Sequence, residues 1–232
     1  GTFTDLFLWS GNQDAETFKV LSTPRDPSLG VLAGLEAIAQ SREISVAELA
    51  ARTSLIVHGT TVTTNAALTR GGARTALLTT EGVRDALEMR RGIRERQYDN
   101  RYTNVVPLVP RRLRRPVPGR LDASGAEVEP LSLEEVRTAA SEFREQGIDA
   151  VAICFMHSYA DDKHERAVAE VVRAELPEAW VSVSSEVLPT IRFYERVSTT
   201  VLNAYVGPVL RDYLANLTNR LADTGFDGIL LI

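Results

Sequence analysis

The sequence holds a single cysteine, Cys154, in 232 residues. One cysteine excludes an internal disulfide framework and suits the reducing cytoplasm, where we expect this protein. No apolar run approaches the ~20 residues that a membrane span needs, and no secretory signal pattern is visible. The G-x-G-x-x-G, G-x-x-x-x-G-K-[ST] and G-x-S-x-G patterns are also missing. These absences argue against a plain dinucleotide-binding fold, a P-loop enzyme and a nucleophile elbow.

The charge balance is mildly acidic. There are 26 basic and 31 acidic residues, the net charge is −5 and the pI is about 5.4. A general nucleic-acid binder is usually basic, so we expect no nucleic-acid partner and no membrane partner. The apolar fraction of 44% and charged fraction of 25% are those of an ordinary globular protein rather than a disordered chain.

Both ends of the sequence resemble interrupted strands. The chain starts without Met at Gly1, and Gly228–Ile232 is an apolar run with no turn after it. We interpret the chain as one piece of a longer polypeptide, and the alternative is a complete small domain with frayed ends.

The pattern along the chain predicts an α/β fold with a mixed sheet. Gly11-Asn12 indicates a hairpin between the first two strands, and later strands alternate with helices as in βαβ units. Pro208 and Gly207 are expected to kink or divide the last helix. The expected strands are 2–8, 17–22, 54–58, 74–79, 150–155, 180–184 and 229–232; the expected helices are 28–40, 45–52, 60–70, 132–146, 161–175 and 188–221.

We expect three segments. Residues 1–89 form a first lobe, 90–131 an Arg- and Pro-rich connector with a small hairpin at 119–129, and 132–232 an α/β segment with long helices. The connector favours a solvated surface loop. The functional alternatives are an anion-facing edge and a contact with an acidic partner subunit. The ten arginines of the connector are Arg90, Arg91, Arg94, Arg96, Arg101, Arg111, Arg112, Arg114, Arg115 and Arg120.

Two segments have the composition of anion sites. In Gly1-Thr2-Phe3-Thr4-Asp5, a glycine turn with hydroxyl residues offers donors to a phosphate, although the same residues suit a polar edge strand. In His58-Gly59-Thr60-Thr61, a glycine joins an apolar strand to a helix whose free N–H groups favour an anion. The simpler alternative is a threonine helix cap beside a core histidine.

A third segment offers a polar helix face. Arg192, Glu195, Thr199 and Asn203 recur at spacings of three or four, as an ion-paired solvated stripe or as one wall of a cleft. His157 and His164 lie near Asp161 and Asp162 and permit a metal, but a helix cap at Asp161 or Asp162 is the simpler interpretation. Cys154 lies in an apolar strand and is expected to be inert.

Seven ordered blocks resemble the N-terminal region of the hydantoinase A/5-oxoprolinase family, and also the ATP-dependent ketone carboxylase subunits. The resemblance runs from Gly1 to Ile232. The blocks are Gly1–Asp5, His58–Thr61 with Thr64-Asn65, Thr79–Asp85, Pro107–Arg111, Cys154–Tyr159, Ser184–Val187 and Tyr194–Tyr205.

This resemblance implies half of an actin-like (Hsp70- and sugar-kinase-like) ATPase with an inserted α/β segment, which uses ATP and Mg²⁺. It implies phosphorylation of a carbonyl oxygen of a cyclic amide, followed by ring opening. It also implies a B-type partner subunit and a homo-oligomer. The implied residues are, for catalysis, His58, Thr60 and Asp5; for nucleotide, Gly1, Thr2, Thr4, Gly59 and Thr61; for substrate, Arg90, Arg91, Asn203 and Tyr205; and for metal, Asp5.

One departure limits the expectation. The family's first phosphate loop has an Asp three residues before the Gly that stands here as Gly1, and the sequence begins after it. We therefore expect the isolated chain to bind ATP poorly and to lack ATPase activity. The alternatives are the ATP-using subunit of an acetone- or acetophenone-type carboxylase and a nucleotide-gated scaffold without catalysis.

Overall fold

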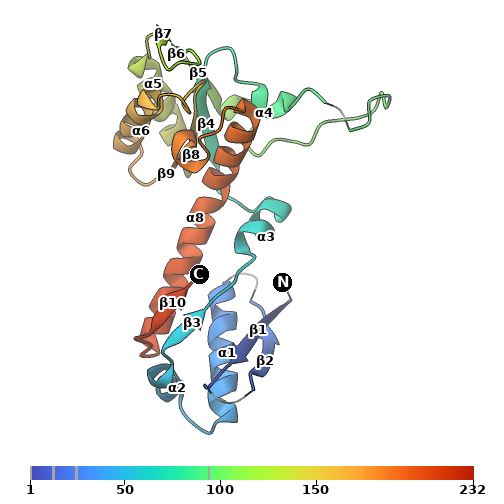
Figure 1. Cartoon of the computed structure of the whole chain (residues 1–232), viewed down its shortest axis with the longest axis vertical. Coiled ribbons are helices and arrows are strands. Elements are labelled where there is room, and N and C mark those ends of the chain that lie inside the picture. The colour runs from blue at the N-terminus through green and yellow to red at the C-terminus, as the bar shows by residue number, and fades with distance from the viewer. Residues whose placement is uncertain (1, 12–13, 24–25, 94) are drawn as a thin grey trace. The chain divides into compact units, whose positions relative to one another are not determined.

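The computed structural model describes residues 2–11, 14–23, 26–93 and 95–232 (Figure 1). Its contacts divide the chain into two compact units. The first unit comprises Gly1–Asn65 and Val209–Ile232, and the second comprises Ala66–Pro208. These bounds differ from the three segments expected from the sequence, which stay a prediction. No described helix is both long enough and apolar enough to cross a membrane.

The first unit contains two small sheets. Strand β1 pairs antiparallel with β2, as the hairpin signal predicts, and Gly11 takes the φ of +63° that favours glycine there. Asn12, the other half of that signal, lies outside the described residues. Strands β3 and β10 are parallel although they are distant in sequence. The bounds are β1 Phe3–Leu8, β2 Glu16–Leu21, β3 Leu55–Val57 and β10 Ile229–Leu231.

Helices α1 (Pro27–Ser41) and α2 (Val46–Arg52) begin at capped positions. The Asp26 side chain accepts a hydrogen bond from the Ser28 amide, and the Ser45 hydroxyl accepts one from the Glu48 amide. Each cap satisfies an amide that has no partner within its helix. Both helix starts were therefore predictable from short sequence signals.

Helix α1 supports both sheets of the first unit. Its Val31 belongs to a cluster that includes Ile56 of β3 and Leu230 of β10. Its Ile38 belongs to another cluster that includes Leu6 of β1. The elements that carry the two expected phosphate corners thus rest on one helix.

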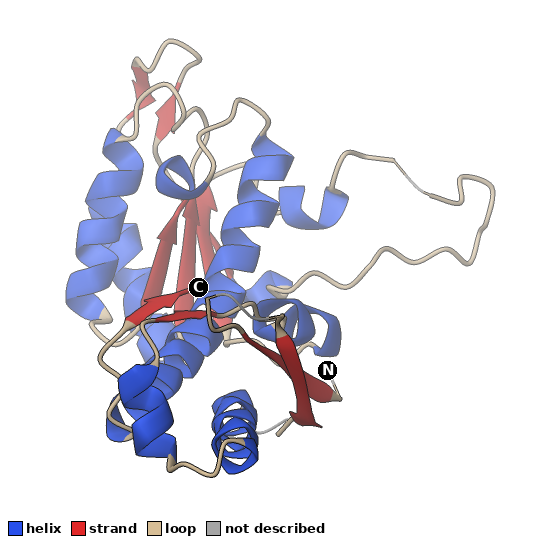
Figure 2. Ribbon diagram, turned by 60° about the horizontal axis from the view of Figure 1, so that its bottom comes forward, coloured by secondary structure: helices blue, strands red, loops and turns tan. Residues whose placement is uncertain are grey.

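The second unit contains a four-stranded parallel sheet in the order β5-β4-β8-β9 (Figure 2). All residues of β4 and β8 are buried, which is typical of a parallel sheet covered on both faces. The bounds are β4 Thr75–Thr80, β5 Arg114–Val117, β8 Ala150–Cys154 and β9 Trp180–Val183.

Strand β5 is absent from the sequence-based prediction. Its sequence Arg-Arg-Pro-Val has two charges and a proline, and both features disfavour a strand. The strand lies at the sheet edge, where proline is tolerated. Arg114 is buried there, and it bonds to the Glu88 carboxylate at 2.9 Å and the Val109 carbonyl at 3.0 Å. Ion pairing therefore makes a buried arginine compatible with a strand.

Helices α5 and α6 cover one face of this sheet and the first half of α8 covers the other (Figures 1 and 2). The predicted capping box is confirmed, since the Ser132 hydroxyl accepts from the Glu135 amide at 3.3 Å. The predicted small hairpin is also confirmed as β6 and β7. The remaining bounds are α4 Ala86–Met89, the 3₁₀ turn η1 Arg111–Leu113, β6 Arg120–Leu121, β7 Glu127–Glu129, α5 Leu133–Glu145, α6 Lys163–Glu175 and α7 Ser184–Val187.

Of the two outcomes expected at Pro208, a kink or a division of the last helix, the division is wrong, and the kink stays a prediction. Helix α8 runs without interruption from Phe193 to Asp223, with Pro208 inside it. Buried apolar side chains lie on both sides of the proline, at Val201 and Ala204 before it and at Leu217 after it. This packing outweighs the one hydrogen bond that proline removes. Helix α8 contributes to both units.

Candidate nucleotide site

The site begins where β3 ends and helix α3 (Val62–Thr69) starts. The Thr60 hydroxyl accepts from the Val62 amide at 3.3 Å, and Thr61 supplies the carbonyl for the Asn65 amide at 2.8 Å. Thr60 therefore caps the helix, as the simpler sequence interpretation predicts. A cap and an anion site are compatible here, because a capped helix start still has unsatisfied amides.

Gly59 makes this corner open. A Cβ added at Gly59 would meet no atom within 4 Å, and its φ lies outside the range that favours glycine. Neither packing nor backbone conformation in this chain therefore requires glycine at this position. The room beside its backbone is suited to close approach by a phosphate.

His58 enters the corner from the end of β3. Its amide donates to the Leu231 carbonyl of β10 at 2.8 Å. Its Nε2 lies 2.6 Å from the Tyr213 hydroxyl of α8. Partial burial lowers the pKa of His58, because burial disfavours the charged imidazolium. The imidazole is therefore neutral at pH 7.

An ion pair lies at the start of α1 in the same unit. The Asp26 carboxylate, which caps α1, bonds to Arg220 of α8 at 2.8 Å. Its hydrogen bond with the Ser28 hydroxyl, together with Arg220, lowers the pKa of Asp26. Burial raises the pKa of Tyr213, and the Asp26 charge adds to that rise. Tyr213 therefore stays protonated at neutral pH.

The β1 candidates divide between the two faces of the strand. Thr4 faces α1 and its hydroxyl lies 3.1 Å from the Ser22 hydroxyl. Asp5 is exposed on the other face and pairs with Lys19 at 3.2 Å. Successive strand residues point in opposite directions, so these two side chains do not converge. Thr2 is exposed at the strand start, and Gly1 lies outside the described residues.

The carboxylates that could hold Mg²⁺ are few. Among the described residues, no three His, Cys, Asp or Glu side chains gather into a metal-binding group. Mg²⁺ is commonly held by one or two carboxylates together with substrate phosphates. The exposed Asp5 is one such carboxylate, although it pairs with Lys19, and its metal role stays a prediction.

The arginine candidates for substrate lie in the second unit and are ion-paired. Arg90 contacts Glu95 at 2.6 Å, and Arg91 contacts Glu195 at 2.6 Å. Hydrogen bonding to Glu95 raises the pKa of Arg90. A substrate anion would therefore compete with a carboxylate at either arginine.

Asn203 and Tyr205 have structural partners within the second unit. The Asn203 side-chain oxygen accepts from the Ser182 hydroxyl at 2.7 Å, although Asn203 is otherwise exposed. The Tyr205 ring is buried against Gly72, where an added Cβ would lie 2.2 Å from a ring carbon. Packing is sufficient to account for Tyr205, and its role in a cleft stays a prediction.

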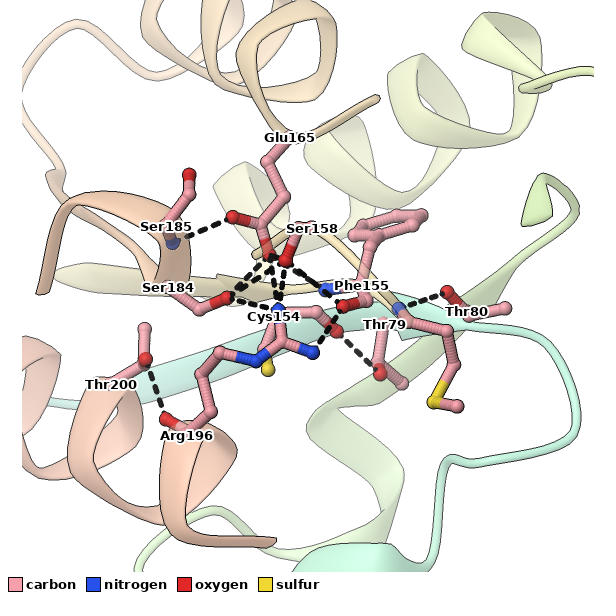
Figure 3. A network of polar contacts seen from close by, with 11 residues as sticks. Thr79, Thr80, Cys154, Phe155, Ser158, Glu165, Ser184, Ser185, Arg196 and Thr200 are labelled. Atoms are coloured by element: carbon pink, nitrogen blue, oxygen red, sulfur yellow. Dashed lines mark hydrogen bonds and ion pairs between the residues drawn. The ribbon is translucent and has the colours of Figure 1, made fainter. Parts of the chain in front are cut away.

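The second unit also contains a buried polar network that the sequence analysis missed (Figure 3). The Glu165 carboxylate accepts from the Phe155 amide at 2.8 Å and from the Ser184 hydroxyl at 2.5 Å. Arg196 donates to the Phe155 carbonyl at 2.8 Å and lies 3.9 Å from Glu165. The network joins the end of β8 to α6, α7 and α8. Its members occur at unrelated spacings, so no local pattern predicts it.

The other candidates for chemistry have ordinary explanations. His164 bonds to Glu127 at 2.6 Å. Asp162 occupies the N-cap position of α6 without a side-chain cap bond, and the adjacent Asp161 accepts from the Lys163 amide at 2.9 Å. Burial raises the pKa of Cys154 to about 12, so the thiol is unreactive as expected.

The comparisons with known proteins establish the family. The family model described as the hydantoinase/oxoprolinase N-terminal region matches residues 1–176. The chain belongs to this family. It is 40% identical over 227 residues to caprolactamase subunit alpha of Pseudomonas jessenii, covering 97% of this chain and 33% of that protein. It is 31% identical over 250 residues to 5-oxoprolinase 1 of Arabidopsis thaliana, covering 96% of this chain and 19% of that protein.

Solved structures show the same α/β fold. The crystal structure of ATP-dependent caprolactamase from Pseudomonas jessenii matches with a TM-score of 0.92 and 40% identity, over 99% of this chain and 34% of that one. The nucleotide-free structure of acetone carboxylase matches with a TM-score of 0.86 and 28% identity, over 99% of this chain and 34% of that chain. The chain thus spans about a third, or less, of the length of these proteins.

Proposed function

We propose that this chain is the N-terminal nucleotide-binding part of an ATP-dependent cyclic-amide hydrolase. The likeness to a protein titled ATP-dependent caprolactamase, at a TM-score of 0.92, carries the proposal. The open Gly59 corner supports it, because that corner presents backbone amides, hydroxyls and room for a phosphate. The expected fold of the whole is an actin-like ATPase, of which this chain supplies one half.

The residues of the corner have distinct proposed roles. Backbone amides near Gly59 and Thr61 hold phosphate oxygens, with Thr2 as a further donor. Thr4 can donate only after its hydroxyl gives up the contact with the Ser22 hydroxyl. Thr60 fixes the helix start. His58 lies near the transferring phosphate or the carbonyl, and Asp5 takes part in binding Mg²⁺. Phosphoryl transfer depends mainly on positioning the phosphate and on neutralising its charge. Neutral hydrogen-bond donors supply the positioning, and a metal cation supplies the neutralisation. Phosphorylating the carbonyl oxygen then makes the amide carbon easier to hydrolyse.

A carboxylase subunit is the second candidate. The chain is 34% identical over its whole length to the acetophenone carboxylase gamma subunit of Aromatoleum aromaticum. In that case the phosphorylated oxygen belongs to an enolate and the second step is carboxylation. Because several relatives are named as subunits, we also propose a B-type partner subunit. A homo-oligomer remains part of the proposal.

The test uses the full-length polypeptide with its partner subunit, Mg²⁺ and ATP. Phosphate release is measured with a lactam, 5-oxoproline, a hydantoin or an aryl ketone, each with and without bicarbonate. Release that depends on a cyclic amide supports the hydrolase, and release that needs a ketone and bicarbonate supports the carboxylase. Release that none of these compounds changes would contradict both and favour a nucleotide-gated scaffold.

Two variants test the corner itself. In the full-length enzyme, His58→Ala is expected to lower kcat at least tenfold with folding intact. Gly59→Ala is expected to weaken ATP binding without changing stability, because the methyl group fits the protein but fills the space beside the backbone. Near-normal turnover and ATP affinity in these variants would remove this corner from the site. In isolation, the chain is expected to show no micromolar affinity for ATP by calorimetry.

A further inference from the structure

We infer that Tyr213 is a positioning residue that fixes His58 with its single proton on Nδ1 and its Nε2 as a hydrogen-bond acceptor. This inference rests on the proposed function, since it concerns the same corner. Tyr213 has no counterpart in the sequence-based set of site residues. Its place in the sequence, among Leu210, Leu214 and Leu217, resembles that of an ordinary core residue.

The geometry begins with a contact between two polar side chains of the first unit. The Tyr213 hydroxyl of α8 lies 2.6 Å from Nε2 of His58, at the end of β3. This contact joins a helix to the strand end that opens into the Gly59 corner.

The direction of the bond follows from the chemistry of its two ends. A phenol O–H is a good donor, and an unprotonated imidazole nitrogen is a much stronger acceptor than a phenol oxygen. The favourable arrangement therefore directs the Tyr213 proton toward His58 Nε2. It makes Nε2 an acceptor and puts the single imidazole proton on Nδ1.

The surroundings keep both rings in the required protonation state. The ionisable groups near His58 come from two elements: Tyr213 and Arg220 belong to α8, and Asp26 lies at the start of α1. Strand β10 contributes only apolar side chains. Asp26 and Arg220 neutralise each other. Partial burial lowers the pKa of His58 and raises that of Tyr213. A neutral imidazole next to a protonated phenol is the state that this arrangement favours.

The consequence for chemistry is specific. With Nε2 occupied by Tyr213, His58 presents an N–H at Nδ1, and no described side chain bonds to that nitrogen. A neutral N–H donor stabilises negative charge on an oxygen without taking up a proton. His58 therefore acts as a hydrogen-bond donor to an anionic oxygen, such as that of a phosphoryl group, and not as a general base.

The direct test reads the position of the proton by ¹⁵N NMR of histidine-labelled full-length protein. The signal of His58 is the one that disappears in His58→Gln. We expect an unprotonated Nε2 and a protonated Nδ1 at pH 7.5, and we expect Tyr213→Phe to lose that preference. A protonated Nε2 in the native protein, or a His58 signal unchanged in Tyr213→Phe, would overturn the inference.

The kinetic test follows the acid limb of kcat/KM against pH. Tyr213→Phe removes a bond that favours neutral imidazole, so the acid limb should move to higher pH by about 0.4 to 1 unit. An acid limb that stays at its native pH in Tyr213→Phe would also overturn the inference.

The chain offers a matched control. Tyr159 forms a second tyrosine–histidine pair, with its hydroxyl 3.3 Å from His157 Nδ1. Tyr159→Phe should leave both the His58 signal and the pH profile unchanged. The NMR result is independent of turnover, so it decides the role of Tyr213 even if no cyclic amide stimulates phosphate release. Failure of the proposed function and failure of this inference are therefore distinguishable.

Discussion

The two units of the chain bury their strands to different extents. In the second unit every residue of β4 and β8 is buried, and one continuous apolar cluster joins the sheet to helices on both faces. In the first unit the strands alternate, so that Phe7 of β1 and Val57 of β3 are each 72% exposed. Two smaller clusters form the core there.

This difference in burial separates the candidate phosphate corner from the buried ion-pair network. The open corner at Gly59 and the His58–Tyr213 pair lie in the unit with the smaller core. The unit with the larger core holds a fully buried ion-pair network instead. Candidate site residues are found where polar groups and backbone remain accessible, and such regions bury less apolar surface. Four experiments test the contrast, in order of decreasing effect.

The largest effect is expected from the buried network of the second unit. Arg196→Met leaves the Glu165 carboxylate buried without its cation, which should lower the free energy of unfolding by about 3–5 kcal/mol. Urea unfolding followed by Trp180 fluorescence in a Trp9→Phe background reports on this unit. The exposed Arg137→Met is the control, with an effect within about 0.5 kcal/mol. Equal stability of the two variants would contradict the proposed importance of the network.

A smaller effect is expected at the helix–strand contact of the first unit. A Cβ on Gly34 of α1 would lie 2.2 Å from a methyl carbon of Leu6. Gly34→Ala should lower stability by about 1 kcal/mol, because overpacking outweighs the gain in helix propensity. Hydrogen exchange of β1 amides measures this locally. Adding Leu6→Ala should remove the clash, so protection of the β1 amides that is no lower in the double variant than in Leu6→Ala alone would support that reason. Slower exchange in Gly34→Ala would show that the contact is loose.

The third experiment concerns pH. Because the pKa of His58 is lowered on folding, the unfolded chain binds a proton below about pH 6.5 that the folded chain does not. Stability should therefore fall as the pH drops from 7.5 to 5.5, by less than about 1 kcal/mol since the ring is partly solvated. His58→Gln should flatten this dependence. Denaturant midpoints at several pH values measure it, and an identical slope in both proteins would show that His58 is not the cause.

The smallest effect is expected at Cys154. Burial in β8 raises its pKa to about 12, so almost no thiolate exists at pH 8. A thiol reagent should leave the native chain unmodified over hours and should label one thiol after denaturation. Rapid labelling of the native chain would show that the second unit opens more readily than its buried core suggests.

Much of the fold follows from local signals. Ser45 with Glu48 and Ser132 with Glu135 marked helix starts, and apolar alternation marked most strands. Strand β5 was missed because a buried Arg114 depends on Glu88, a partner 26 positions away. The continuity of α8 through Pro208 was missed because packing against two cores is not visible in the helix sequence.

In the candidate site too, sequence patterns predict local features but not contacts between distant residues. Gly59 and its threonines stand together in the sequence, and their composition alone indicated an anion corner. Tyr213 lies 155 positions from His58, so only the folded chain brings the pair together. The adjacent Thr4 and Asp5 looked like one cluster, whereas strand geometry turns their side chains apart.

Pro208 lies inside α8, next to the boundary where the helix passes from one unit to the other. Proline has no N–H to offer the Ala204 carbonyl, so the helix lacks one backbone hydrogen bond at that level. A helix bends most easily where such a bond is missing. The bending stiffness of α8 is therefore lowest beside the boundary, and Pro208→Ala is a direct way to make the helix stiffer.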